Sequence, residues 1–445
     1  MSTIIELPWG SDLLRVSLPE NWGLLGELKP KSAPVISVPA DACAEALSRP
    51  IGAERLGSRD LAGRRIALVV DDHSRPTPVK DFIKPVLGEL ASAGARDEDI
   101  DILIATGVHR ASRLEEVERK IGPDVMGRYR WRCHDAYDAN DLVDMGVTGR
   151  GTPVFLNKLL AQADLIVCLG ALEPHLLLGF GGGLKMIVPG CAGVETIGKN
   201  HMQGVDPDHF DYVGTPGDHS PMRLDLEEGA GLLGREIFVV NAVMNEQARP
   251  TAFFCGHPVK AHRAGETLVQ DLVRLEVPEQ SDVVLTNSFP MDLDLRQSAK
   301  CLGNTLYACK PGGVIMGCLR CEHGLGEMPL AKKTPPYTAM RLLLKIIGKK
   351  RILQLVEKAK KGEPIEETFL GHFALQMLRR NHLAIFSDSK EVPPDIGRKM
   401  GLAKSYRDVQ EMLAWAAGKV TGRATIWVFP YGGTTYAATA SGAEN

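Results

Sequence analysis

Three side chains capable of active-site chemistry lie in one glycine-rich segment, residues 172–201. His175 comes first, four glycines follow between positions 179 and 183, and Lys185 and His201 come after them. A histidine titrates near neutral pH and can accept or donate a proton. A lysine between apolar neighbours tends to lose its charge, and a neutral amine can act as a nucleophile or a covalent anchor. The glycines would let the backbone pass close beside a bound molecule.

The segment does not match the common nucleotide-binding motifs. Leu184 separates Gly183 from Lys185, so the Gly-Lys-Ser/Thr ending of a P-loop is absent. Residues 186–189 predict extended backbone, which argues against a dinucleotide fingerprint that opens a helix. Phosphate binding through backbone N–H groups stays open. On the residues alone, Lys185 could equally be a lysine whose ammonium reaches water, and His201 could be a cation at a helix end.

Further polar side chains follow two earlier apolar runs. Asp72 ends the run 65–72, His73, Ser74 and Arg75 follow it, and His109 comes after the run 101–107. The arginine fork matches carboxylate or phosphate geometry, although a salt bridge within the loop would explain the Asp72–Arg75 pair as well.

A third group lies much later in the chain. Gln297 and Lys300 are three residues apart, which places them on one face of an expected helix. They could offer an amide and an ammonium to a ligand across a cleft, although a solvated helix face is the commoner explanation of such a pair. Cys318 and Cys321 have the spacing that begins a zinc site, but no second Cys/His pair follows at a suitable distance.

The elements that must position these residues are parallel strands. The apolar runs 65–72, 101–107 and 164–170 each end in polar residues. Ligands of open parallel sheets bind beyond the carboxyl ends of the strands, where the strand order reverses. We therefore expect the loops that carry Arg75, His109 and His175 to converge in one crevice.

The expected fold class is α/β, with two α/β domains, mainly parallel sheets and a cleft between them. A new α/β pattern begins near residues 282–287, so residues 1–272 form the expected N-terminal domain and residues 273–445 the C-terminal one. The first fifty residues predict a small β segment and a connector. The N-terminal domain would carry Lys185 and His201, and the C-terminal domain would contribute Gln297 and Lys300.

The composition excludes several classes of function. The formal net charge of −3 gives no basic footprint for nucleic acid or an anionic membrane. The start of the chain does not resemble a signal peptide, and no apolar run approaches the about 18 residues of a membrane span. Nine scattered cysteines predict a reduced, cytoplasmic protein.

Together these motifs resemble the nickel-pincer lactate racemase family, over most of the chain. The most specific match is the stretch from Pro174 to Gly193 and on to His201. The motifs Asp-His-Ser-Arg at 72–75, Thr-Gly-Val-His at 106–109 and Gln-Ser-Ala-Lys at 297–300 have the order and spacing of that family.

The resemblance implies a racemase or epimerase of a 2-hydroxy acid, such as lactate, made together with cofactor-synthesis enzymes. Family members carry a nickel-pincer nucleotide, the pyridinium-3-thioamide-5-thiocarboxylic acid mononucleotide with nickel, attached covalently to a lysine. By this likeness Lys185 matches the anchor and His201 the nickel ligand. His109 and His175 match two alternate bases. The remaining matches are cofactor contacts in Asp72, His73, Ser74 and Arg75, and substrate contacts in Arg75, Gln297 and Lys300.

Two departures from the family and two alternative functions accompany this interpretation. Phe373 stands where some members carry a tryptophan, and Cys191 stands where an aliphatic residue is common. One alternative is a nicotinamide-dependent hydroxy acid dehydrogenase, against which the missing dinucleotide fingerprint argues. The other is a non-catalytic organic-acid-binding protein, which would need neither paired bases nor an anchor lysine.

Overall fold

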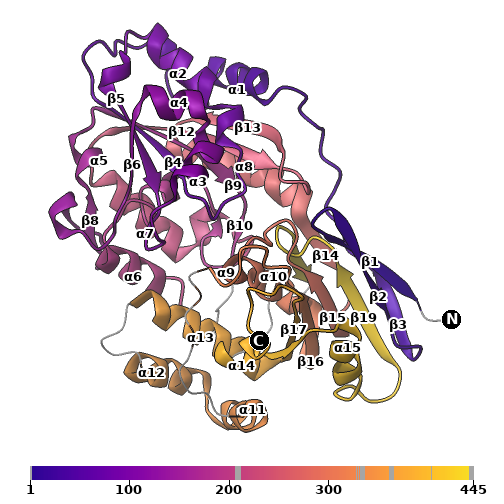
Figure 1. The fold of residues 1–445 in the computed structure, drawn as a ribbon. Coiled ribbons are helices and arrows are strands. Elements are labelled where there is room, and N and C mark those ends of the chain that lie inside the picture. The colour runs from indigo at the N-terminus through magenta and orange to yellow at the C-terminus, as the bar shows by residue number, and fades with distance from the viewer. Residues whose placement is uncertain are drawn as a thin grey trace.

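Two six-stranded sheets with helices packed around them form the molecule (Figure 1). The computed structural model describes residues 3–205, 212–326, 328, 330, 336–359, 365–401 and 403–439. The expected α/β class, with mainly parallel sheets, is confirmed. Among the helices in these ranges, none is both long and apolar enough to cross a bilayer.

The first sheet contains all three apolar runs expected to form strands. Its order is β13 (Pro250–Gly256), β12 (Glu236–Met244), β9 (Leu165–Leu172), β4 (Ile66–Asp71), β5 (Ile100–Ala105) and β6 (Arg130–Cys133). All neighbours are parallel except β13, which pairs antiparallel with β12. From β4 the chain builds outward to β6 and then returns to β9 on the other side. The strand order therefore reverses between β4 and β9, as a ligand crevice requires.

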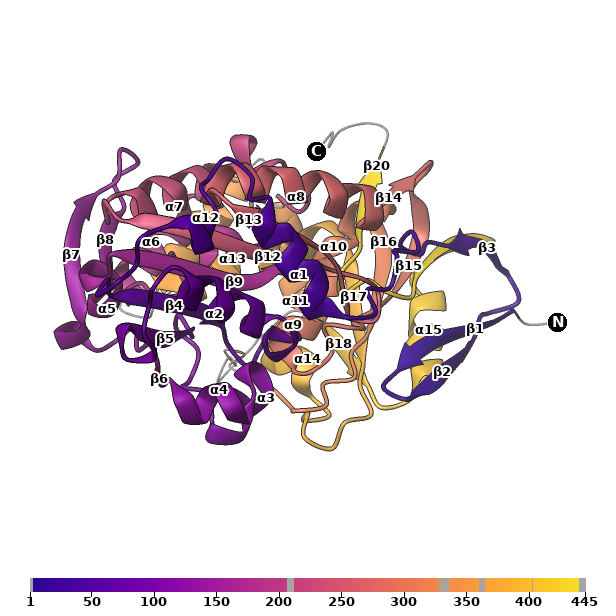
Figure 2. The same cartoon turned by 90° about the horizontal axis from the view of Figure 1, so that it is seen from above.

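Helices cover both faces of the first sheet. They are α1 (Pro39–Ser48), α2 (Ile83–Ser92), α3 (Leu114–Ile121), α4 (Pro123–Arg128), α5 (Lys158–Gln162), α6 (Val194–Met202), α7 (Pro221–Gly231) and α8 (Pro258–Val273). Side chains of α1 and α2 pack into the core on one face, and those of α5 to α8 pack into the core on the other. Helices α7 and α8 run along the same side of the molecule (Figure 2).

The second sheet is parallel throughout. Its order is β18 (Lys404–Tyr406), β17 (His382–Phe386), β16 (Cys309–Cys318), β15 (Ser281–Asn287), β19 (Ala424–Phe429) and β3 (Trp22–Glu27). Its order reverses between β15 and β19, and the chain that leaves β15 leads to the residues around Gln297. Its helices are α9 (Leu295–Ser298), α10 (Lys300–Asn304), α11 (Tyr337–Ile346), α12 (Lys349–Ala359), α13 (Ile365–Arg380), α14 (Ile396–Lys399) and α15 (Val409–Ala417).

Four two-stranded pairs complete the fold. They are β1 (Ile4–Trp9) with β2 (Asp12–Ser17), β7 (Leu142–Val147) with β8 (Pro153–Asn157), β10 (Pro174–His175) with β11 (Gly179–Phe180), and β14 (Arg274–Val277) with β20 (Tyr436–Thr439). The parallel β14–β20 pair lies where the chain leaves α8 for the second sheet.

The N-terminal β segment packs with the second sheet, although the chain runs from it into the first. Strand β3 forms the edge of the second sheet beside β19, and the buried face of the β1–β2 hairpin packs into the same core. The apolar face of the hairpin, which includes Leu7, and Trp22 of β3 are buried only where residues of the second sheet cover them. Whether residues 1–272 and 273–445 fold as separate domains stays a prediction.

We expect Leu7→Ala to lower the free energy of unfolding by about 2–5 kcal/mol, because it removes a fully buried side chain from the core that the hairpin shares with the second sheet. Leu13→Ala, in the same hairpin but 56% exposed, should change it by no more than about 0.5 kcal/mol. Chemical denaturation measures both. Equal losses in the two variants would contradict this placement of the hairpin.

Candidate functional site

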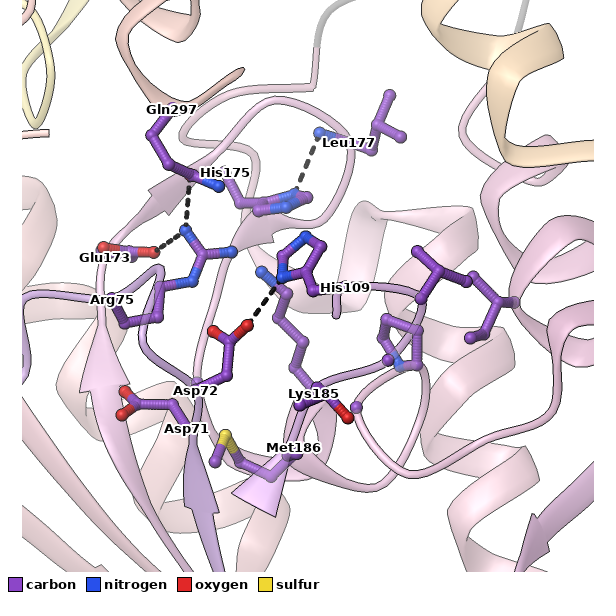
Figure 3. A pocket seen from close by; sticks show the side chains of 18 of the residues that line it. Asp71, Asp72, Arg75, His109, Glu173, His175, Leu177, Lys185, Met186 and Gln297 are labelled. Carbon is purple, nitrogen blue, oxygen red and sulfur yellow. Dashed lines mark hydrogen bonds and ion pairs between the residues drawn. The ribbon is translucent and has the colours of Figure 1, made fainter. Parts of the chain in front are cut away.

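A cavity lies between the two sheets, at the carboxyl ends of β4, β5 and β9 (Figure 3). Eight of the residues singled out from the sequence line it: Asp72, Arg75, His109, His175, Lys185, His201, Gln297 and Lys300. Residues from both halves of the chain thus meet in one space. His73 and Ser74 do not line it.

His109 is bonded to Asp72 at the end of β4. The His109 Nδ1 atom lies 2.7 Å from Asp72 Oδ2, and the Ser74 hydroxyl donates to Asp72 Oδ1 at 2.7 Å. Burial alone would raise the pKa of Asp72, but His109 and Ser74 hold it well below its ordinary value. The carboxylate keeps the imidazole proton on Nδ1, so Nε2 of neutral His109 carries the lone pair. His73 lies beside this pair, with its Nδ1 3.0 Å from Ser112 Oγ.

His175 carries its proton on the other ring nitrogen. Its Nδ1 accepts hydrogen bonds from the backbone N–H groups of Leu177 and Leu178, at 3.3 and 3.2 Å. The proton of neutral His175 therefore sits on Nε2. Burial, followed by the charges of Lys185 and Lys300, lowers the pKa of His175 well below its ordinary value. The cavity thus holds one imidazole ready to accept a proton and one ready to donate a hydrogen bond.

The glycine-rich loop places Lys185 in the cavity through a tight turn. The extended backbone expected for residues 186–189 was wrong, because residues Gly183–Met186 form a 3₁₀ turn and Ile187 continues in the helical region. Gly182 and Gly183 have φ of 74° and 57°, which suits glycine. The Gly183 N–H donates to Asn241 Oδ1 at 2.8 Å.

The Lys185 amine lines the cavity, and its side chain is only partly exposed. Burial, then the charges of Arg75 and Lys300, lowers the pKa of Lys185 well below its ordinary value. In the part of the chain that the structure describes, its Nζ makes no hydrogen bond or ion pair. The lowered pKa makes the uncharged form of this amine more accessible, and that form can attack an electrophile.

His201 comes from α6 and presents an imidazole suited to a metal. Its Nδ1 lies 2.7 Å from the Ile197 carbonyl oxygen, which fixes the proton there and leaves the lone pair on Nε2. Burial lowers the pKa of His201 to about 4, so the ring is neutral at physiological pH. Among the described residues, no group of three or more His, Cys, Asp and Glu could hold a metal ion.

Arg75 and Lys300 converge on one oxygen across the cleft. Arg75 Nη1 and Lys300 Nζ donate to Gln297 Oε1, at 3.0 and 2.6 Å. Two cations that share one carbonyl oxygen can also bind a ligand carboxylate. Burial, then the charge of Arg75, lowers the pKa of Lys300 to about 7.

Two residues at or beside the site were missed from the sequence. Glu173 lies 3.1 Å from Arg75 Nη1, and its place just after β9 was the signal that could have singled it out. Lys120 is buried on α3 and donates to Asp71 Oδ1 at 2.7 Å and to the carbonyls of Arg75 and Thr77. Nothing local distinguishes Lys120, because α3 has the composition of a charged surface helix.

The two departures from the family lie in different places. Phe373, on α13, lines the cavity from the second half of the chain. Cys191 is fully buried in the core beneath the first sheet and does not line the cavity.

We expect Lys120→Met to lower the free energy of unfolding by about 3–5 kcal/mol, because it leaves Asp71 buried without its cation. Lys84→Met is the matched control, since Lys84 pairs with Asp124 at 2.9 Å on the surface. That variant should lose about 1 kcal/mol or less. The two denaturation midpoints measure the difference, and similar losses would contradict the buried ion pair.

Comparison with known proteins finds relatives that match most of the chain. Residues 9–211 match the family model described as the lactate racemase N-terminal domain. A lactate racemase from Thermoanaerobacterium thermosaccharolyticum is 31% identical over 326 residues, which cover 72% of this chain and 75% of that protein. A lactate racemase from Lactiplantibacillus plantarum is 26% identical over 397 residues, covering 87% and 88%.

A solved structure extends the likeness to the whole fold. The lactate racemase apoprotein from Thermoanaerobacterium thermosaccharolyticum superposes with a TM-score of 0.81 at 27% identity, covering 98% of this chain and 100% of that one. The chain belongs to the lactate racemase family, and it is an isomerase of the racemase type.

Proposed function

We propose that this protein interconverts the enantiomers of a 2-hydroxy acid, with lactate as the first candidate, by removing the α-hydrogen as hydride and returning it. The observation that carries the proposal is the unpaired amine of half-buried Lys185, in a cavity that also holds the cations Arg75 and Lys300 and two histidines with lone pairs on different ring nitrogens. An unactivated C–H bond beside a carboxylate resists direct deprotonation, so the reaction needs an electron sink.

The residues present fit the nickel-pincer nucleotide as that electron sink. Lys185 offers the amine for covalent attachment, and His201 Nε2 offers one donor to nickel. Because the described residues offer no further cluster of metal ligands, the other donors would come from the cofactor itself. When bound, this group would supply a site that takes up the substrate's α-hydrogen with its electron pair and gives it back.

The side chains of this protein would bind and orient the substrate. Arg75 and Lys300 would bind its carboxylate in place of the Gln297 amide oxygen, which now occupies the position between them. Glu173 would keep the Arg75 guanidinium aimed at that position. A planar 2-keto acid held by these cations can be reduced on either face, which gives both enantiomers.

His109 and His175 would serve as alternate bases. His109 Nε2 accepts the hydroxyl proton, and Asp72 stabilises the imidazolium that forms. In the reverse direction His175 would take this role. Its Nδ1 would first have to release the Leu177 and Leu178 N–H groups, so that the ring proton can sit on Nδ1 and the lone pair on Nε2. Asp72, expected as a cofactor contact, would thus also orient a base. The nine free cysteines support a reducing, cytoplasmic location, where cofactor-synthesis enzymes would be the partners.

Protein produced together with cofactor-synthesis enzymes should contain nickel, carry added mass on Lys185 and convert L-lactate into a racemic mixture. Lys185→Ala should lose the added mass and the activity, because the nucleophile is gone. Lys310→Ala removes a lysine that is bonded to Asp282 outside the cavity and should keep both. Intact-mass, metal and chiral chromatographic analysis give the answer. Neither nickel nor added mass in wild-type protein, with the cofactor pathway active, would sink the proposal.

Substrate binding should weaken as the pH rises above about 7. Below that pH Lys300 is protonated and binds the carboxylate as an ammonium. Above it the Lys300 amine of the empty site is uncharged, so it must take up a proton before it can bind the carboxylate. Affinity for L-lactate should then fall by up to about tenfold per pH unit. Calorimetric titration of the cofactor-free chain from about pH 6 to about pH 9 measures this fall. Lys300→Arg should flatten the profile, because a guanidinium stays charged. If the affinity of Lys300→Arg falls with pH as steeply as that of the wild type, a group other than Lys300 causes the fall and the prediction is wrong.

A further inference from the structure

Helix α7 contacts residues next to three of the site residues without lining the cavity itself. Ser220, its N-cap, donates from Oγ to the Leu177 carbonyl at 3.3 Å, two residues after His175. Asp225 accepts from the side chain of Asn200 at 2.8 Å, one residue before His201. Arg223, between them, donates to carbonyls of the loop that precedes Lys185. One helix therefore contacts the backbone near His175 and Lys185 and a side chain next to His201.

Arg223 makes the most extensive of these contacts. Its side chain is 1% exposed, and its guanidinium donates to the carbonyls of three successive loop residues, Phe180, Gly181 and Gly182. The distances are 3.3 Å to Gly181 and 3.4 Å to Gly182. His262 Nε2 lies 2.7 Å from the same Gly181 carbonyl. Three carbonyls turned toward one guanidinium fix the orientation of three consecutive peptide planes, and the Lys185 turn begins at the next residue.

The charge of Arg223 is poorly compensated for so buried a group. Its Nε lies 3.9 Å from Glu227 Oε1, and Glu227 is bonded more closely to Arg263, at 2.9 Å. The charge of Arg223 also lowers the pKa of Lys185, although burial and the charges of Arg75 and Lys300 lower it more. Such a charge is useful if the Lys185 amine must stay uncharged.

We propose that Arg223 is a positioning residue for Lys185. Arg223 donates hydrogen bonds to the Phe180, Gly181 and Gly182 carbonyls, so that the turn after them places the Lys185 amine in the cavity. The positive charge of Arg223 also opposes protonation of that amine. This inference rests on the proposed role of Lys185 as the covalent anchor. The other charged or titratable groups near Lys185 are Arg75, Lys300, Glu173, His175 and His201.

The test follows the reaction of Lys185 with cyanate in protein made without the cofactor-synthesis enzymes. Carbamylation of Lys185 is measured by peptide mass spectrometry across a pH series, and the pH of half-maximal rate is compared between variants. Arg223→Met should raise that pH by about one unit or more, because a cation is lost and the loosened loop admits water. Arg223→Lys keeps the charge but lacks the guanidinium that bonds to three carbonyls, so it should raise the pH of half-maximal rate by less.

Arg341→Met is the matched control for the loss of a buried arginine. Arg341 is 4% exposed and also donates to two backbone carbonyls, those of Leu378 and Asn381, but in the second half of the chain. It should leave the Lys185 profile unchanged. An unchanged profile in Arg223→Met, or an equal shift in Arg341→Met, overturns the proposal.

Two further outcomes are also decisive. If Arg223→Met does not fold, Arg223→Lys decides alone, and a wild-type profile in that variant contradicts the role of the fork. Because the labelling needs no cofactor, a failure of the proposed function would appear separately, as wild-type protein that acquires no mass on Lys185.

Discussion

A partly buried amine without a bonded counter-ion among the described residues is the constraint on which the site depends. Taking an ammonium out of water is costly unless it is paired, and the cations Arg75, Lys300 and Arg223 around Lys185 outnumber the one carboxylate, Glu173. The pKa of the amine is lowered for this reason, and in the proposed function the uncharged amine is the nucleophile that a covalent cofactor needs. The glycines, the 3₁₀ turn and the buried arginine behind the loop all serve to hold that amine where it would otherwise not stay.

The second requirement is a cleft built from both halves of the chain. Each parallel sheet reverses its strand order near its middle, and the loops beyond these two points face each other. The first sheet contributes the histidines and Arg75, whereas the second contributes Gln297 and Lys300. Neither half alone carries both cations of the proposed carboxylate site. In the proposed function the substrate would therefore bind between the halves, where closure would exclude water from the keto acid intermediate.

The sequence predicted the parts of the site that topology governs. Residues that directly follow apolar strands, such as Arg75, His109 and His175, meet because the ends of parallel strands share one edge of a sheet. Contacts between residues far apart in the sequence could not be predicted, because no local sequence pattern indicates them. The Asp72–His109 bond joins the ends of two strands, and buried Lys120 comes from a helix of surface composition. The turn at Lys185 depends on glycine conformations and on Asn241, which lies 58 residues further along the chain.

The claim that the α-hydrogen leaves as hydride and returns to carbon is tested most directly with an isotope. The cofactor-loaded enzyme is incubated with unlabelled L-lactate in deuterium oxide, and the D-lactate formed is separated and examined by mass spectrometry and proton NMR. A transfer of hydride within the closed cavity retains the original hydrogen, so we expect D-lactate without deuterium at the α-carbon. D-lactate deuterated at that carbon would mean that a base removes the hydrogen as a proton, which would contradict the proposed mechanism.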